Sequence, residues 1–588
     1  MLSRRHFLAA ATASALAMPR ESEAGPQRGV TGRVITEDRQ PIAGARVTLF
    51  DLDQSLARVT HTDRQGRYRF SRVGDGTHHL DVAARGFLYR HVIISVLGGR
   101  FSFDFQLQAE TAVGEWRVVG NLDPAMTGSS LSGTLLPDGR VFLSSDGIHS
   151  LIFDPASEQL STPAPTTSPQ VGHTAALLPD GRVLLIGGGS QDLDGTVTPG
   201  NRVRVYDAAS DTWDEWAGLL EPRNAAGIAR LSDGRFLVIG GQGDGGAPLA
   251  SCEILDPIAG ETTAAAPLPV AVGYSPAVPL LTGEILVTWD SPRIYSPKTD
   301  SWRAAPAFQQ PDRADLEPCP SGHTPPTGET PHPGDLPDHS LTVLADGRVA
   351  AVGVRRTANA SEPSAAEIYD DRPEGWTTAG SPRTVRSMSQ VLPLPDGRLL
   401  VAGGREEDPD TAEDLDAWCQ VPRTDLFDPS TGSWRRVADM HVARGFHGVS
   451  VLLPDGRVLV AGGEGQPGLN VAATGSGTIE VFTPPSFSRG ARPQVGVLAV
   501  TELKRGSSFS LGFSESAPLT DLVLVSAAAR TRWSDGGTQR VVPLRFRIQK
   551  QTVRATLPKS EAMLPAGLYL LFALDGDIPS EGQLVTVF

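Results

Sequence analysis

The sequence has few cysteines, few aromatic residues and no excess of positive charge. Only 3 of its 588 residues are Cys, so disulfide bonds are not expected to be its main source of stability. Acidic residues outnumber basic ones, 67 to 52, which gives a formal net charge of −15. That balance excludes nucleic acid and anionic membrane as main partners, because both bind a basic surface. No apolar run is long enough to cross a bilayer as a helix, so we expect no transmembrane segment.

Glycine and proline are abundant instead, with 63 Gly and 47 Pro, while aromatic residues make up 6%. This composition is typical of many short strands joined by turns. The chain is also too long for one ordinary hydrophobic core, so several domains are expected.

The N-terminus has the pattern of an export signal. The paired arginines of Ser3-Arg4-Arg5 precede an apolar run over residues 7–18, which has small residues around Ala15-Leu16-Ala17. This pattern predicts a twin-arginine signal peptide over residues 1–24, and a periplasmic or secreted protein. The alternative is a buried N-terminal helix.

One phrase recurs along the chain, and its fullest form is the stretch His447–Gly463. It comprises an apolar strand, the Asp455-Gly456 turn, a second apolar strand and a glycine pair. An Asp-Gly turn between apolar runs predicts a β-hairpin, because these residues supply the positive φ angles of a tight reversal. Seven copies start near Ser132, Gly172, Ala225, Ser275, Asp338, Met388 and His447. An all-strand repeat of about 35 to 60 residues predicts a seven-bladed β-propeller, here over residues 113–489.

A further strand and a tryptophan strand follow in most copies, as in Tyr206-Asp207 and then Trp213. This order and the glycine pairs resemble kelch repeats. The seventh copy lacks its tryptophan strand, whereas an unassigned one, residues 115–122 with Trp116, precedes the first copy. We therefore expect residues 115–122 to pair with the last blade and close the ring.

Two sandwiches are predicted to flank the propeller, which makes the fold class all-β. Residues 28–109 alternate in polarity between Gly- and Asp-containing turns, and they resemble the carboxypeptidase-regulatory-like, transthyretin-like module. Residues 490–588 alternate in the same way and predict an immunoglobulin-like sandwich.

Several motifs in the C-terminal part resemble the galactose oxidase and glyoxal oxidase family. They are the segments 482–485, 539–544, 564–572 and 578–580. Members of that family are copper radical oxidases, which oxidise alcohols or aldehydes and release hydrogen peroxide. The resemblance implies a cysteine cross-linked to a tyrosine, a second axial tyrosine and two histidine ligands.

The positions of these five groups can be compared with the family one by one. His447 matches a copper histidine, and Phe446 stands where the axial tyrosine should be. Ala225 replaces the radical tyrosine, Gly172 replaces the cross-linking cysteine, and Arg532 replaces the second histidine. Phenylalanine cannot ligate a metal, and arginine keeps its proton. We therefore expect a divergent member of this family that lacks copper-radical activity. Copper is the metal that the family holds, and we expect no cofactor in this chain.

Three histidines near strand starts form a second candidate site. His173, His339 and His447 lie on copies two, five and seven, and they would form a three-histidine metal site if they converged. The alternative is that each is a separate polar residue with its own hydrogen bonds.

Three arginines also lie just before strand starts. Arg223, Arg386 and Arg444 could bind a carboxylate or a sugar acid on the propeller face, together with Phe446 and His447. The alternative is that the arginines form salt bridges between blades.

Two insertions, residues 309–337 and 405–420, interrupt the repeats. They carry Cys319 and Cys419, which an oxidising compartment would allow to form a disulfide. Cys252 lies on a predicted strand and is expected to be a buried free thiol.

Two functions remain open from the sequence. The first is an exported binding protein that holds a carbohydrate or other small ligand on the propeller face. The second is a secreted oxidase, or another enzyme, with an altered metal site.

Overall fold

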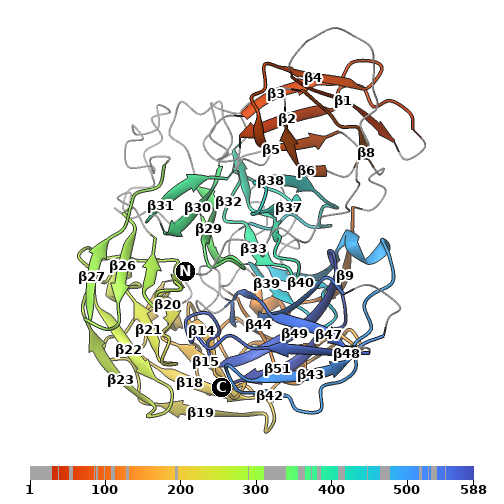
Figure 1. Cartoon of the computed structure of the whole chain (residues 1–588). Coiled ribbons are helices and arrows are strands. Elements are labelled where there is room, and N and C mark those ends of the chain that lie inside the picture. The colour runs from red at the N-terminus through yellow and green to blue at the C-terminus, as the bar shows by residue number, and fades with distance from the viewer. Residues whose placement is uncertain are drawn as a thin grey trace. The chain divides into compact units, whose positions relative to one another are not determined.

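A computed structural model gives the fold of the chain (Figure 1). The structure describes residues 29–36, 39–51, 57–84, 87, 90–97, 100–107, 113–127, 131–192, 196–288, 291–309, 339–354, 365–372, 374–379, 386–407, 418–445, 448–463, 477–514, 519–527, 529–530, 539–549 and 551–588. The chain divides into two units, Met1–Val113 and Gly114–Phe588. Within the described ranges, regular structure consists of strands and the short 3₁₀ helices η1 (Pro124–Met126), η2 (Asp244–Gly246) and η4 (Pro485–Ser488). None of the described helices is long and apolar enough to cross a membrane.

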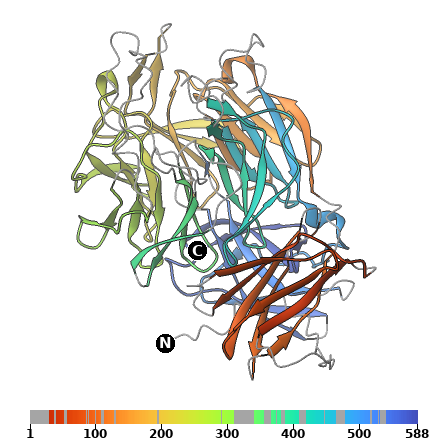
Figure 2. The same cartoon turned by 90° about the horizontal axis from the view of Figure 1, so that it is seen from above.

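The first unit is a sandwich of two sheets, whose strands are red and orange in Figure 2. One sheet has the order β4 (Arg67–Ser71), β1 (Gly29–Thr36) and β7 (Arg100–Ser102), with β8 (Phe105–Leu107) also paired to β1. The other has the order β3 (Ala57–His61), β2 (Arg46–Asp51), β5 (Gly76–Ala83) and β6 (Arg90–Val96). Alternate residues of β4 are buried and exposed, as the sequence pattern predicts for a sheet with one face on a core.

The second unit begins with seven four-stranded antiparallel sheets, which are the predicted blades. In order from the innermost strand, blades 1 to 4 are β10 (Ser132–Leu135), β11 (Val141–Ser144), β12 (Ser150–Asp154), β13 (Gln159–Ser161); β14 (Thr174–Leu177), β15 (Val183–Ile186), β18 (Val203–Asp207), β19 (Thr212–Trp216); β20 (Gly227–Arg230), β21 (Phe236–Ile239), β22 (Cys252–Asp256), β23 (Glu261–Ala265); and β24 (Ala277–Pro279), β25 (Ile285–Val287), β26 (Arg293–Ser296), β27 (Ser301–Ala304).

Blades 5 to 7 follow the same plan. They are β28 (Ser340–Val343), β29 (Val349–Val354), β30 (Ala365–Asp371), β31 (Glu374–Thr378); β33 (Gln390–Pro393), β34 (Leu399–Ala402), β37 (Thr424–Asp428), β38 (Ser433–Arg436); and β39 (Gly448–Leu452), β40 (Val458–Gly462), β41 (Thr478–Thr483), β9 (Glu115–Asn121). The innermost strand of each blade contacts that of the next, and β39 of blade 7 contacts β10 of blade 1.

The fourth strand of blade 7 is β9, which comes from the start of the unit. It pairs with β41 from Thr478↔Asn121 to Thr483↔Glu115, so the predicted pairing of residues 115–122 is confirmed. The Trp116 ring lies 4.9 Å from that of Phe482, and its Nε1 donates to the carbonyl oxygen of Ala438, 2.9 Å away.

The hairpin turns differ in detail from the tight reversal expected of Asp-Gly. In blade 1 the amide of Leu136 donates to the oxygen of Arg140, and the amide of Gly139 donates to that of Leu136. Only the glycine has a positive φ, 88° at Gly139, so the loop is a three-residue type I turn with a bulge at glycine. Asp138 accepts from both the amide and the Nε of Arg140, and this local pair recurs at Asp180–Arg182, Asp233–Arg235, Asp346–Arg348, Asp396–Arg398 and Asp455–Arg457.

Tryptophan hydrogen bonds connect consecutive blades. Tyr206 on β18 lies 4.9 Å from Trp213 on β19, and its hydroxyl donates to Asp211. The Trp213 Nε1 donates to the carbonyl oxygen of Ala164, which precedes blade 2. Because Trp302 and Trp376 make the corresponding bonds, the tryptophan motif is a repeated connection between blades.

The C-terminal strands form a second sandwich on the same core. One sheet has the order β42 (Glu502–Leu503), β51 (Gln583–Val587), β49 (Gly567–Asp575), β44 (Asp521–Ser526) and β46 (Val541–Pro543), with β50 (Ile578–Pro579) paired to β49. The other has the order β43 (Ser508–Gly512), β48 (Thr552–Thr556) and β47 (Arg545–Gln549). Val525 and Phe572 belong to the cluster that fills blades 1, 2, 6 and 7, so the propeller and this sandwich share a hydrophobic core.

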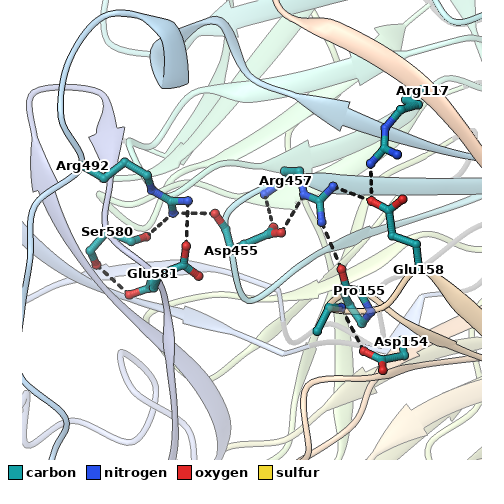
Figure 3. A network of polar contacts seen from close by, with 10 residues as sticks. Arg117, Asp154, Pro155, Glu158, Asp455, Arg457, Arg492, Ser580 and Glu581 are labelled. Atoms are coloured by element: carbon teal, nitrogen blue, oxygen red, sulfur yellow. Dashed lines mark hydrogen bonds and ion pairs between the residues drawn. The ribbon is translucent and has the colours of Figure 1, made fainter.

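Figure 3 shows a polar network where blades 7 and 1 meet the C-terminal sandwich. The Arg457 Nη1 lies 3.0 Å from Oε1 of Glu158 in blade 1, and Arg117 of β9 pairs with the same carboxylate. Arg492 donates from Nη2 to the carbonyl oxygens of Asp455 and Ser580, each 2.6 Å away. These contacts join the first and last blades to each other and to the C-terminal sandwich.

Candidate functional site

Two residues at the starts of blades 2 and 3 are direct neighbours. The amide of Ala225 donates to the carbonyl oxygen of Gly172 at 2.7 Å. Both residues have a left-handed backbone, with φ of 73° at Gly172 and 52° at Ala225. These are the positions that the family resemblance assigns to a cross-linked cysteine and tyrosine, so the fold brings both positions together but supplies only a hydrogen and a methyl group.

Amide side chains lie beside this pair. Asn224 is 8% exposed, and its Oδ1 has no hydrogen-bond partner among the described residues. A Cβ at Gly172 would lie 3.4 Å from the Cβ of Asn224. The main chains of Asn224 and Gln242 exchange hydrogen bonds of 3.0 and 2.8 Å, and a Cβ at Gly273 would lie 3.5 Å from Cγ of Gln242.

We call Gly172, Asn224, Ala225, Gln242 and Gly273 the amide surface. It runs across the starts of blades 2, 3 and 4, and Tyr274, which is partly exposed, follows it directly along the chain. The sequence motifs did not point to Asn224 or Gln242. A polar residue directly before a left-handed position is the signal that would have found Asn224.

The two described histidines of the predicted metal site each bind a hydroxyl group of the preceding blade. His173 donates from Nδ1 to the carbonyl oxygen of Gln170 at 2.8 Å, and its Nε2 lies 2.9 Å from Oγ of Ser132. The Nε2 of His339 lies 2.7 Å from Oγ1 of Thr288. Burial lowers the pKa of His173 below its ordinary 6.5, and the Gln170 hydrogen bond opposes that shift only in part.

No group of three or more His, Cys, Asp or Glu that could hold a metal occurs in the part of the chain that the structure describes. His447 lies outside that part, as do Phe446 and Arg532. The convergence of His173, His339 and His447 therefore stays a prediction.

The three arginines proposed as ligand-binding residues are buried and paired with carboxylates. Arg223 is 0% exposed, and its Nη2 lies 2.5 Å from Oε1 of Glu253. Arg444 lies 2.9 Å from Glu480 in the same way. The third pair is Arg386, on β32 (Arg386–Ser387), with Asp425.

Each of these ion pairs lies within one blade, not between blades as the alternative interpretation had it. The arginine precedes the innermost strand, and its carboxylate stands on the third strand of the same sheet. The arginine Nη1 also donates to the first carbonyl of the glycine pair, at Gly240, Gly403 or Gly462. These contacts give the three arginines a structural role and occupy the guanidinium groups that an acidic ligand would need.

The C-terminal sandwich also sends a strand to the innermost strands of the propeller. The short strand β45 (Ala529–Arg530) pairs with β10 and contacts β14 and β39. It directly precedes Thr531-Arg532, where the family has its second histidine. Thr531 and Arg532 lie outside the described residues, so the assignment of Arg532 to that position stays a prediction.

Two sets of short strands follow glycine pairs near these blade starts, and of the two insertions only residues 309, 405–407 and 418–420 lie in the described ranges. A ribbon of β16 (Gly189–Gln191) and β17 (Val197–Pro199) follows the glycine pair of blade 2. Strands β35 (Arg405–Glu407) and β36 (Trp418–Gln420) pair with each other, and β35 pairs with β32.

The cysteine predictions have different outcomes. Cys252 on β22 is a buried free thiol, as predicted, and burial raises its pKa to about 11. Cys319 lies outside the described residues, so its disulfide with Cys419 stays a prediction.

Comparisons with known proteins agree with this architecture. Residues 29–108 match the carboxypeptidase regulatory-like domain, and residues 492–587 match the galactose oxidase-like early set domain. A copper-bound fungal alcohol oxidase has a similar structure, with a TM-score of 0.63 at 19% identity over 81% of this chain and 99% of that one.

Curated relatives are distant. A galactose oxidase of Gibberella zeae is 23% identical over 424 residues, which is 66% of this chain and 58% of the relative. An aldehyde oxidase of Arabidopsis thaliana is 26% identical over 235 residues, 36% of this chain and 37% of the relative. The matched parts thus span between about a third and three fifths of these two relatives. The chain thus has a carboxypeptidase regulatory-like domain at residues 29–108, a galactose oxidase-like early set domain at residues 492–587, and a fold similar to that of the copper-bound alcohol oxidase.

The residues at the family's metal site do not fit a copper-radical centre. Gly172 has no side chain to form a thioether, and Ala225 has no phenol to carry a radical or ligate a metal. No tyrosine adjoins Ala225 and no cysteine adjoins Gly172 in sequence, so a shift of the alignment by a few residues supplies neither group.

Proposed function

We propose that this is an exported binding protein that holds a carbohydrate or similar hydroxyl-rich ligand on the amide surface, without copper-radical chemistry. The observation that carries the proposal is the contact between Gly172 and Ala225, where redox side chains are replaced by the two smallest residues. Export by the twin-arginine route rests on the N-terminal sequence.

The chemistry of the amide surface favours a neutral ligand. Asn224 Oδ1 is a buried acceptor without a partner in the described structure, so it would gain a hydrogen bond to a ligand hydroxyl if the side chain turned outward on binding. Amide side chains both donate and accept, which suits the hydroxyl groups of a sugar. The arginines that would attract an acidic ligand are held by Glu253, Asp425 and Glu480.

A glycan array probed with the purified chain tests this function. We expect binding to a limited set of glycans, weakened about five- to thirtyfold by Asn224→Ala, because a buried acceptor that bonds a ligand contributes about 1–2 kcal/mol. The matched control is Gln159→Ala, an exposed amide on the outermost strand of blade 1, which should bind as the wild type does. Equal loss in both variants, or no glycan bound by the wild type, would refute the proposal.

A further inference from the structure

A second polar region lies between blade 3 and the C-terminal sandwich, away from the amide surface. Its central residue is Arg230, the last residue of β20, which is 6% exposed. Its guanidinium makes no hydrogen bond or ion pair among the described residues. The guanidinium makes a cation–π contact with the Phe236 ring, whose centroid lies 5.8 Å from Cζ of Arg230.

An unpaired buried guanidinium is costly. Arginine cannot lose its proton in a protein at neutral pH, so burial leaves an uncompensated charge in a medium that solvates it poorly. The other buried arginines of the blades show the usual solution, since Arg223, Arg386 and Arg444 each have a carboxylate. Burial also lowers the pKa of Arg230 to about 10, which leaves it fully charged at neutral pH.

Two more arginines face the same region from the C-terminal sandwich. Arg540 donates from Nη1 to the oxygen of Ala562 and lies, through Nη2, 3.5 Å from the oxygen of Pro279 in blade 4. The Nη2 of Arg505 lies 2.8 Å from Oε1 of Glu561. All three guanidinium groups interact electrostatically with Tyr569, whose hydroxyl already donates to the oxygen of Pro565 at 2.7 Å.

The Arg230 guanidinium packs closely against Gly567. A Cβ at Gly567 would lie 3.0 Å from its Nη1, and Gly567 is on the same face of β49 as Tyr569. Only Nε of this guanidinium is both fully buried and unpartnered, so Nη1 and Nη2 retain access to small species. Glu561 pairs with Arg505, whereas Arg230 has no carboxylate partner among the described residues.

We propose that Arg230, Arg505 and Arg540 form a binding site for one small oxyanion, such as phosphate, sulfate or a carboxylate. The anion would pair with Nη1 and Nη2 of Arg230 and join blade 3 to the C-terminal sandwich. Planar guanidinium groups bind such oxyanions in a bidentate manner. The site is separate from the amide surface and does not depend on the function proposed there.

Thermal unfolding of the full chain with increasing phosphate, sulfate or acetate, against sodium chloride of equal ionic strength, tests the site. We expect at least one oxyanion to raise the melting temperature saturably, because a ligand that binds only the folded state stabilises it. Titration calorimetry with the same anion should give one site per chain. The three salts also show whether a tetrahedral anion or a carboxylate is preferred.

Arg230→Met should abolish the saturable response, whereas Arg235→Met should keep it, because Arg235 lies on the same blade and already pairs with Asp233. Arg505→Met, at a less buried position, should weaken anion binding several-fold. This second variant tests the site if Arg230→Met does not fold. A wild type that responds to no oxyanion beyond chloride would overturn the proposal. A saturable response unchanged in both Arg230→Met and Arg505→Met would overturn it equally.

Discussion

The amide of Ala225 donates to the carbonyl oxygen of Gly172 at 2.7 Å, across the boundary between blades 2 and 3. Both residues keep a left-handed backbone, although neither has the side chain that the family's redox chemistry requires. The two positions that the resemblance aligns with the cross-linked pair are thus in contact, and neither has a reactive side chain.

The left-handed conformation of Ala225 predicts a stabilising substitution. An L-residue with a Cβ pays about 1–2 kcal/mol in this conformation, whereas glycine pays almost nothing. Ala225→Gly should raise the free energy of unfolding by up to about 1 kcal/mol, since glycine also loses more backbone entropy. Ala226→Gly is the matched control, because Ala226 is buried and has no positive φ. This variant should lower the free energy of unfolding by about 1 kcal/mol. Calorimetric melting that places both variants below the wild type would contradict this reading.

Breaking the ion pair of Arg223 with Glu253 by a single substitution should lower the free energy of unfolding strongly. Arg223→Met leaves a carboxylate that is 2% exposed without its cation, so we expect a loss of about 3–5 kcal/mol in chemical denaturation. The double variant Arg223→Met/Glu253→Leu should recover part of that loss, because no charge remains buried, while the backbone amides of Leu220 and Glu221 lose their acceptor. Arg235→Met, which breaks a surface pair on the same blade, should cost under about 1 kcal/mol. A double variant no more stable than Arg223→Met alone would refute this account.

The buried His173 predicts a loss of stability in mild acid. Its folded-state pKa lies below the ordinary 6.5, so below that pH the unfolded chain binds a proton that the folded chain resists. The stability that the neutral ring contributes is thus fully present above about pH 6.5 and is lost as the pH falls from there to the folded-state pKa. His173→Gln should flatten the fall in melting temperature below pH 6.5, whereas the exposed control His61→Gln should leave it unchanged. An identical pH profile in wild type and His173→Gln would show that the ring does not titrate in this way.

The sequence predicted the blades well because each copy contains its own turn and strands. Gly139 and its counterparts set the hairpins locally, and Trp116 could be assigned to blade 7 because that copy lacked a tryptophan. The early set sandwich was likewise visible as alternating strands.

The roles of the arginines were harder to predict, because a residue's partner depends on packing across the sheet. Arg223 is 30 residues from Glu253 in sequence, and the two meet only when the third strand packs beside the first two. An acidic residue in the apolar third strand, as at Glu253, Asp425 and Glu480, was the available signal. Arg230 carries no such signal, since its surroundings depend on how the C-terminal sandwich packs on blade 3.

Copper binding with peroxide release is the most direct test of the central claim. The purified chain would be incubated with copper, desalted and analysed for metal, then assayed for hydrogen peroxide with galactose, glyoxal and small alcohols beside an active galactose oxidase. With Gly172 and Ala225 in place of the cysteine and tyrosine, we predict no stoichiometric copper and no peroxide above the blank. One copper per chain together with peroxide release would contradict the account and establish the chain as an oxidase with an altered metal site.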